Sequence, residues 1–199
     1  MAIGTINPLA IKAGPGRIYY APLGTAIPTF TAAASKIVGT WTSWVQAGST
    51  DEGITYSEST DTEDIRVAES LYPVRTVTTS KAGTVSLSLS EIHDLNWKLV
   101  SNGGTIATSG TGATKINTFV PPLAGSEVRV MLGFISADDD EVIIWPQVFN
   151  TGGFETARAN FSDKHSLPAE FSVELPDPAV LTTPYKRWVS GATSLALGI

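Results

Sequence analysis

Alternating apolar and polar residues predict strands along most of the chain. Val85, Leu87 and Leu89 alternate with serine and threonine, which is the pattern of a strand with one buried face. Just before them, residues 74–79 are rich in β-branched side chains, and residues 80–83 (Ser-Lys-Ala-Gly) have the composition of a turn. Together these segments predict a hairpin with a short loop.

Two more strand pairs follow further along the chain. Residues 127–135 and 141–149 form the first predicted pair, around a turn at 138–140. Both faces of these strands are apolar, so we expect them to be central and covered on both sides. Residues 154–161 and 169–175 form the second predicted antiparallel pair.

One helix is predicted between the strands, at about 91–101. Ser90 is a suitable N-cap, Glu91 and Asp94 place negative charge in the first turn, and Lys98 lies in the last. Three apolar residues fall on one side at helical spacing: Ile92, Leu95 and Leu99. The pattern predicts a mainly β fold, a sandwich or barrel with one flanking α-helix.

The two ends of the chain differ from the middle. Residues 1–16 and 176–199 contain several prolines and predict extended N-terminal and C-terminal arms around a domain at 17–175. The last residues carry no charge and end in an apolar run that includes Leu195, Leu197 and Ile199. A solvated tail is normally polar. We therefore expect this tail to dock, either on its own domain or on a neighbouring chain.

Composition narrows the function classes. The chain has 199 residues, of which 42% are hydrophobic but only 16% charged, so we expect much of its surface to contact other chains. The net charge of −6 disfavours general attraction to nucleic acid, which depends on Lys and Arg. There is no cysteine, hence no disulfide or thiolate metal site. We expect neither a secretory signal nor a membrane span.

No catalytic or metal-binding pattern emerges. His93 and His165, the two histidines, lack metal-ligand spacing, so we expect surface positions for both. Residues 138–140 (Asp-Asp-Asp) lack the alternating ligands of a calcium loop and predict a charged hairpin turn. The glycines at 103–112 follow the helix and predict a flexible loop. We expect a protein that is not an enzyme and has no cofactor.

The segment 51–74 is the most informative one. Seven acidic residues stand against one base, Arg66, and apolar residues are interspersed among them. Apolar anchors within a charged frame suit a loop that inserts into another subunit. The residues that define this predicted loop are Glu58, Asp61, Glu63, Asp64, Ile65, Arg66, Val67, Glu69, Leu71 and Tyr72.

The order of several motifs resembles a known family. Residues 62–66 (Thr-Glu-Asp-Ile-Arg) lead to 69–74 (Glu-Ser-Leu-Tyr-Pro-Val), and a Thr/Val-rich segment precedes a helix with Asp-Leu-Asn at 94–96. An opening Gly-Arg-Ile-Tyr-Tyr-Ala-Pro at 16–22 fits the same pattern. Over about residues 14–175, the chain resembles the major tail proteins of long non-contractile bacteriophage tails, particularly those of phages that infect actinobacteria.

The resemblance implies a fold, a function and partners. These proteins share a tail-tube β-sandwich with a flanking helix, and six copies form a ring whose inner sheets join into a barrel. Rings stack through a long loop, here the acidic loop, and through terminal arms. It also implies a virion protein, made in the host cytoplasm, with a tail-tip or baseplate initiator, a tape measure and a tail terminator as partners. Double-stranded DNA passes through the lumen.

A hydroxyl-rich face predicts the lining of such a lumen. By alternation the candidates are Thr76, Thr78, Ser80, Ser86, Ser88 and Ser90, although a one-residue bulge would reverse the facing of Thr76 and Thr78. Short hydroxyls and scattered acids offer phosphates no strong partner, and like charges repel over about 8–10 Å at physiological salt. We hypothesise a neutral-to-negative bore.

Two other classes of protein are weighed against this interpretation. A carbohydrate-binding β-sandwich module would use the faces of some of the five tryptophans, although most stand in apolar patterns that favour core packing. A glycoside hydrolase would need paired carboxylates, for which Glu52, Glu58 and Asp64 are the available acids.

Overall fold

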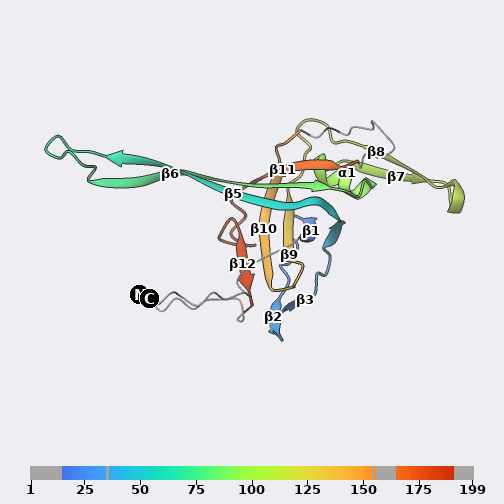
Figure 1. The fold of residues 1–199 in the computed structure, drawn as a ribbon. Coiled ribbons are helices and arrows are strands. Elements are labelled where there is room, and N and C mark those ends of the chain that lie inside the picture. Colours follow the sequence, from blue (N-terminus) through green and yellow to red (C-terminus); the bar gives the residue numbers. More distant parts are fainter. Residues whose placement is uncertain (1–14, 35, 154, 156–164, 191–199) are drawn as a thin grey trace.

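A computed structural model describes residues 15–34, 36–153, 155 and 165–190 of the chain. Within them the protein is mainly β, with one α-helix, α1 (Asp94–Val100), and a short 3₁₀ turn, η2 (Gly112–Thr114). The strands are β1 (Gly16–Pro22), β2 (Phe30–Ala33), β3 (Lys36–Gly39), β4 (Val45–Gly48), β5 (Thr50–Ile65), β6 (Arg75–Leu89), β7 (Thr105–Ser109), β8 (Ile116–Val120), β9 (Val130–Ser136), β10 (Glu141–Asn150), β11 (Leu167–Val173) and β12 (Lys186–Val189). A body of strands carries two projecting hairpins (Figure 1).

An antiparallel sheet forms the body and curls back on itself. Its strands follow the order β4-β1-β9-β10-β11-β6-β5, and β12 pairs with β10 beside this path. β4 and β5 stand at opposite ends of this order, yet only Ser49 separates them in the chain. The sheet therefore bends round. Gly48, at φ 84°, lies at the corner in a backbone region that other residues rarely adopt.

The inner face of the curled sheet encloses the main core. Leu132, Trp145 and Phe171, from three different strands, are at most 1% exposed. The alternating apolar residues of β6 point into the same core, as the sequence predicted. Burial of each large apolar side chain stabilises the fold by roughly 1.5–3 kcal/mol, so this core fixes which face of β6 points inward.

β9 and β10 are covered on both faces, which confirms the prediction that they are central. Their second face carries Met131, Ile135 and Val142, and the β2–β3 hairpin packs over it. Aromatic side chains complete this outer layer, where Tyr19 and Trp41 stack with ring centroids 4.3 Å apart.

Helix α1 starts three residues later than predicted, and His93 caps it instead of Ser90. The Nδ1 atom of His93 accepts a hydrogen bond from the backbone N–H of Asn96, 3.3 Å away. Ser90 donates its backbone N–H to the carbonyl of Ser49 (2.9 Å) and so belongs to the sheet corner. The carboxylate of Glu91 likewise accepts from Ser49, so this acid lies outside the first turn of the helix.

Buried asparagines fasten α1 to the sheet. Asn96 is fully buried, and its Nδ2 donates to the carbonyl of Ala47 at 2.8 Å. Asn102, which follows the helix, exchanges two hydrogen bonds of 2.7 and 2.8 Å with the backbone of Asn150. The side chain of Asn150 in turn donates to the carbonyl of Val100 and accepts the N–H of Glu170. Amide groups thus position the helix where charges would be costly to bury.

The hairpin predicted around residues 80–83 is wrong. β6 runs straight through them, and its partners are β5 on one side and β11 on the other. Ser-Lys-Ala-Gly is composed like a turn, but the side chains here lie on an exposed ribbon, where small and polar residues are tolerated. Of the other predicted pair, residues 169–173 lie in β11, and most of 154–161 is outside the described residues.

Part of the predicted C-terminal arm belongs to the body. β12 (Lys186–Val189) pairs with the first half of β10, from Glu141–Val189 to Ile144–Lys186. Trp188 packs in the outer aromatic layer against Phe30, with ring centroids 5.0 Å apart. The apolar end residues Leu195, Leu197 and Ile199 and most of the N-terminal arm lie outside the described residues.

Candidate functional site

The β5–β6 hairpin is the foremost candidate site because much of it lies outside the body (Figure 1). β11 pairs with β6 only as far as the Val173–Gly83 pair. Beyond it, within the described chain, β5 and β6 pair only with each other as far as Ile65–Arg75. We name residues 57–82 the arm, and all of them except Val77 are exposed. An isolated two-stranded ribbon is marginally stable at best in water.

The acidic segment that the sequence predicted as a loop is largely this ribbon. Five of the predicted loop residues lie in β5: Glu58, Asp61, Glu63, Asp64 and Ile65. The other five lie in the turn that joins the strands: Arg66, Val67, Glu69, Leu71 and Tyr72. Both faces of the ribbon meet solvent, so no apolar alternation marks the strand, and acidic residues have low strand propensity. These two features hid it from the sequence analysis.

A bulge divides the six hydroxyl residues predicted to share one face. The pairing shifts between Asp61 and Thr62, where β6 contributes one extra residue. Thr76 and Thr78 therefore lie on the face that continues into the buried side of β6. Three of the six stay together on the opposite, outer face: Ser80, Ser86 and Ser88. Ser90 lies beyond the end of β6. Because the bulge also turns Thr76 and Thr78 to the other face, the prediction that all six residues share one face is wrong.

Cross-strand hydrogen bonds hold some of the arm's acids in place. Asp61 accepts from the Ser80 hydroxyl at 2.6 Å, and Asp64 accepts from the Thr76 hydroxyl at 2.7 Å. Glu58 pairs with Lys81 at 3.4 Å and Asp64 with Arg66 at 3.6 Å. Within the described chain, Glu63 and Glu69 have no such partner, so their charges are available to another molecule.

The turn at the end of the arm presents apolar side chains to solvent. We name residues 65–74 the tip. Backbone bonds of 2.9 Å (Val74 to Ile65) and 3.2 Å (Ser70 to Val67) close it. Its exposed apolar residues are Ile65 (48% exposed), Val67 (45%), Leu71 (95%), Tyr72 (81%) and Val74 (62%). Such a cluster on a solvent-exposed turn is typical of an interaction site.

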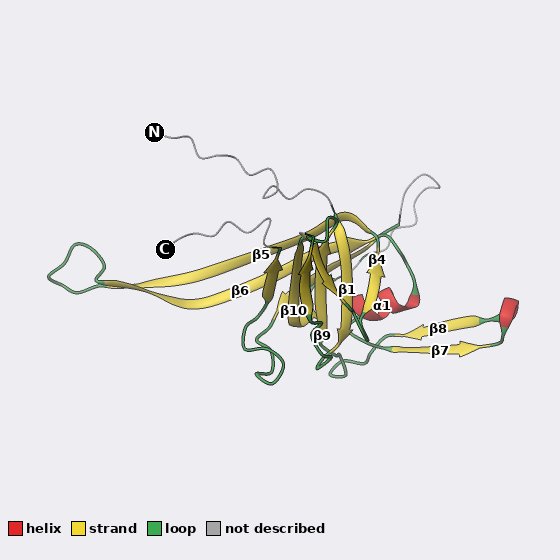
Figure 2. Cartoon of the chain, turned by 90° about the horizontal axis from the view of Figure 1, so that it is seen from below, coloured by secondary structure: helices red, strands yellow, loops and turns green. Residues whose placement is uncertain are grey.

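A second ribbon, β7–β8, projects from the other end of the body (Figure 2). One of its faces packs on α1, where Phe119 lies 6.3 Å from Trp97 and Asn117 donates to Asp94 at 2.7 Å. Sequence reasoning predicted a flexible loop at 103–112 because of its glycines. The strand signal was present in the β-branched residues of 105–108 and 116–120, but neither strand contributes a residue to the buried cores.

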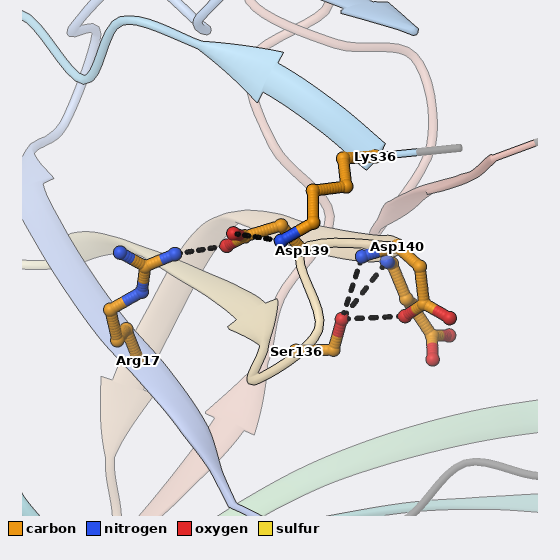
Figure 3. A network of polar contacts seen from close by, with 6 residues as sticks. Arg17, Lys36, Ser136, Asp139 and Asp140 are labelled. Atoms are coloured by element: carbon orange, nitrogen blue, oxygen red, sulfur yellow. Dashed lines mark hydrogen bonds and ion pairs between the residues drawn. The ribbon is translucent and has the colours of Figure 1, made fainter. Parts of the chain in front are cut away.

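The charged turn at 138–140 is a hairpin turn, as predicted, and two of its three acids, Asp139 and Asp140, already have partners (Figure 3). Asp139 forms ion pairs with Arg17 and, at 3.7 Å, with Lys36. The Ser136 hydroxyl donates to the carboxylate of Asp140 at 2.7 Å. Within the described part of the chain, no group of three His, Cys, Asp or Glu residues could hold a metal ion.

The features required by the two alternative functions are poorly developed. None of the five tryptophans is exposed, and Trp44 and Trp145 are 8% and 1% exposed, so no tryptophan presents an open face to a sugar. Glu58 and Asp64 stand six residues apart on one strand, about 20 Å at the usual rise. Paired glycosidase carboxylates are about 5–9.5 Å apart. Glu52 is among the residues whose side chains the structure does not describe.

One comparison with known proteins identifies a family. A family model described as phage tail tube protein matches residues 5–172, which include both projecting hairpins and most of the body, though not β12. No match is found among curated proteins. Among the described residues, no helix is long and apolar enough to cross a bilayer.

Proposed function

The chain belongs to the phage tail tube protein family, and we propose that six copies form a ring and that rings stack into a hollow tube that conducts genomic DNA into the host. Membership of the family gives the chain a structural role in the virion tail, where it assembles into a tube with other tail proteins. The stoichiometry, the passage of DNA and the nature of those partners are our proposal.

The arm is the observation that carries the proposal. It exposes both faces and both outer edges, although an isolated ribbon of two strands is barely stable in water. Unpaired edges are also a template for pairing with other chains, which most proteins avoid. Insertion of the arm between neighbouring copies would pair its edges and cover one of its faces. The arm is therefore the proposed stacking element.

The terminal segments are proposed to add contacts between copies. Residues 1–16 and the apolar end of the chain, with Leu195, Leu197 and Ile199, would lie against neighbouring subunits. Further contacts at the tube ends would involve a tail-tip or baseplate initiator and a tail terminator, with a tape measure protein inside the growing tube. The chain itself would be made in the cytoplasm of the bacterial host.

The outer face of β5 and β6 is the proposed lining of the bore. It combines Ser80, Ser86 and Ser88 with Thr55 and Ser57 of the partner strand. Asp61 adds negative charge to this face, while Lys81 lies on the opposite one. A surface of short hydroxyls with scattered acids would let DNA slide, because phosphate binding depends on Lys and Arg.

Negative-stain electron microscopy of the purified chain at rising concentration tests the proposal. We expect hollow tubes or six-fold rings. Monomeric particles at all concentrations, both alone and with purified tail-tip complexes added as initiators, would contradict assembly into stacked rings.

A further inference from the structure

A shallow apolar groove lies on the body, away from the arm. It is formed between α1, β1, β4 and the segment before β9, and its volume is about 510 Å³. Four large apolar side chains line it while remaining well exposed: Leu23 (46%), Val45 (36%), Leu95 (43%) and Val128 (49%). Pockets of roughly 300–1,000 Å³ commonly bury a ligand the size of several side chains.

The chain cannot fill this groove with its own tip. The arm leaves the body on the side opposite α1 and the β7–β8 hairpin (Figures 1 and 2). Along it, β5 runs for several residues past the last β11 pair, which corresponds to roughly 25 Å at the rise of a strand. The apolar side chains of the tip and those of the groove therefore lie at opposite ends of one molecule, so a contact between them needs two copies.

The charges around the two surfaces are complementary. Lys98 lines the groove, is exposed and has no ion-pair partner within the described chain. Arg129 lines it too, with its guanidinium bound to Glu174 at 2.9 Å. Glu69 lies in the tip and Glu63 near the end of β5. Within the described chain, these are the acids of the arm that have no hydrogen-bond or ion-pair partner. Docking would bring unpaired acids to an unpaired base, which favours this pairing over contact between two acidic arms.

We propose that the tip of one copy docks into the groove of the next, with Leu71 and Tyr72 in the apolar part and Glu69 near Lys98. The inference rests on the proposed function, because it names the surface that receives the stacking arm. The contact joins two different surfaces, so it is heterologous. Repetition of such a contact adds further copies instead of closing a symmetric pair, and where the repeat does not close into a ring it grows as an open filament, as a tube requires.

Cysteine cross-linking tests the contact directly, since the natural chain contains no cysteine. A Leu71→Cys chain is mixed with a Leu95→Cys chain, oxidised mildly and resolved on non-reducing gels. Val38→Cys, at an exposed position (53%) on β3, replaces Leu95→Cys in the control mixture. Docked thiols reach an effective concentration in the millimolar range. At micromolar protein, we therefore expect at least about tenfold more disulfide-linked heterodimer in the mixture with Leu95→Cys than in the mixture with Val38→Cys.

Electron microscopy of the same samples separates the two hypotheses. Tubes without selective cross-linking would overturn the groove contact and leave the tube proposal standing. Absence of both tubes and cross-links would count against both. In a further mixture, a Leu197→Cys chain replaces the Leu71→Cys chain. If Leu95→Cys cross-links more to Leu197→Cys than to Leu71→Cys, the C-terminal segment fills the groove and the inference is overturned.

A charge exchange provides a second, independent measurement. Lys98→Glu should raise the protein concentration needed for tube growth, measured by light scattering, and Glu69→Lys combined with it should restore growth. Lys115→Glu, at an exposed lysine beside η2, is the matched control and should leave growth unchanged. Equal losses from Lys98→Glu and Lys115→Glu would mean that overall charge, and not the groove, controls assembly.

Discussion

At the scale of single residues, neutral amide side chains hold the helix against the sheet, a role that charged pairs have in many other proteins. Asn96, Asn102 and Asn150 join α1 to β4 and β10 through bonds to backbone groups, and Asn150 also links β10 to β11. An amide offers a donor and an acceptor at once, without the desolvation cost of a charge. The orientation of the helix, and with it one wall of the groove, depends on these contacts.

Asn150→Ala should therefore destabilise the fold by about 2–4 kcal/mol, because it leaves the buried carbonyl of Val100 and the partly buried N–H of Glu170 without their partner. Asn117→Ala, which removes two exposed hydrogen bonds, one donated to Asp94 and one accepted from Thr108, is the control and should cost less than about 1 kcal/mol. Urea unfolding of the purified chains measures both. A loss for Asn150→Ala no larger than that for the control would contradict the assignment.

Tyr20 should make stability depend on alkaline pH. Burial raises the pKa of its phenol to about 12, and the hydroxyl has no hydrogen-bond partner among the described residues. The unfolded phenol ionises near pH 10. The stabilisation of the fold is therefore complete below pH 10 and is lost as the pH rises through about 12.

Tyr20→Phe removes this titration. The variant should be as stable as the natural chain at pH 8, or slightly more so, and clearly more stable at pH 11, in urea unfolding at the two pH values. If the unfolding free energies of Tyr20→Phe and the natural chain differ by the same amount at both pH values, the pKa of the phenol is the same in the folded and unfolded states, which would contradict the prediction.

At the scale of elements, the arm and the body should differ in stability. The body surrounds two apolar cores, whereas the arm, which begins just after Tyr56, contributes no residue to either. In the monomer, backbone amides of residues 57–82 should exchange with deuterium many times faster than those of β9 and β10, and assembly should protect them. Equal protection of the arm in monomer and tube, measured by mass spectrometry, would contradict its insertion between copies.

A shortened arm should fold but not assemble. Replacement of residues 59–82 by Asn-Gly joins Glu58 to Gly83, which already face each other, through a two-residue hairpin turn. The unfolding temperature of the monomer should stay within a few degrees of that of the natural chain, because the cores are intact. Tube growth should be abolished. Tubes formed by this variant would exclude the arm as the stacking element.

The sequence predicted elements well where burial imposes a period. β9 and β10 were recognised because both of their faces are apolar, and β6 was recognised from Val85 onward because one face is. Within the arm, residues 75–79 were recognised as strand from their β-branched side chains, but the acidic residues 58–65 were not. β7–β8 were not recognised either, since none of these segments contributes to the buried cores and so none shows a period. The acids and apolar residues of the tip were still identified as an interaction segment. The groove was not, because its residues come from four segments distant in sequence.

At the scale of the whole molecule, the layers have distinct exteriors. The β2–β3 hairpin covers the outer face of β1, β9 and β10, and the main core lies between these strands and β6, which β11 connects to β10. The exposed faces of these two layers point in opposite directions. If the hydroxyl face of β6 lines the bore, β3 must then lie on the outside of the tube.

This arrangement predicts selective labelling of assembled tubes. Ser88→Cys should react with a small maleimide in monomer and tube alike, but with a maleimide carrying a bulky polymer only in the monomer, because a narrow bore excludes the polymer. Val38→Cys, on β3, should react with both reagents in both states. Gel shifts measure the labelled fraction. Ser88→Cys that reacts freely with the bulky reagent in intact tubes would place the hydroxyl face outside. The bore would then be formed by another surface, and the argument that its hydroxyls let DNA slide would no longer apply.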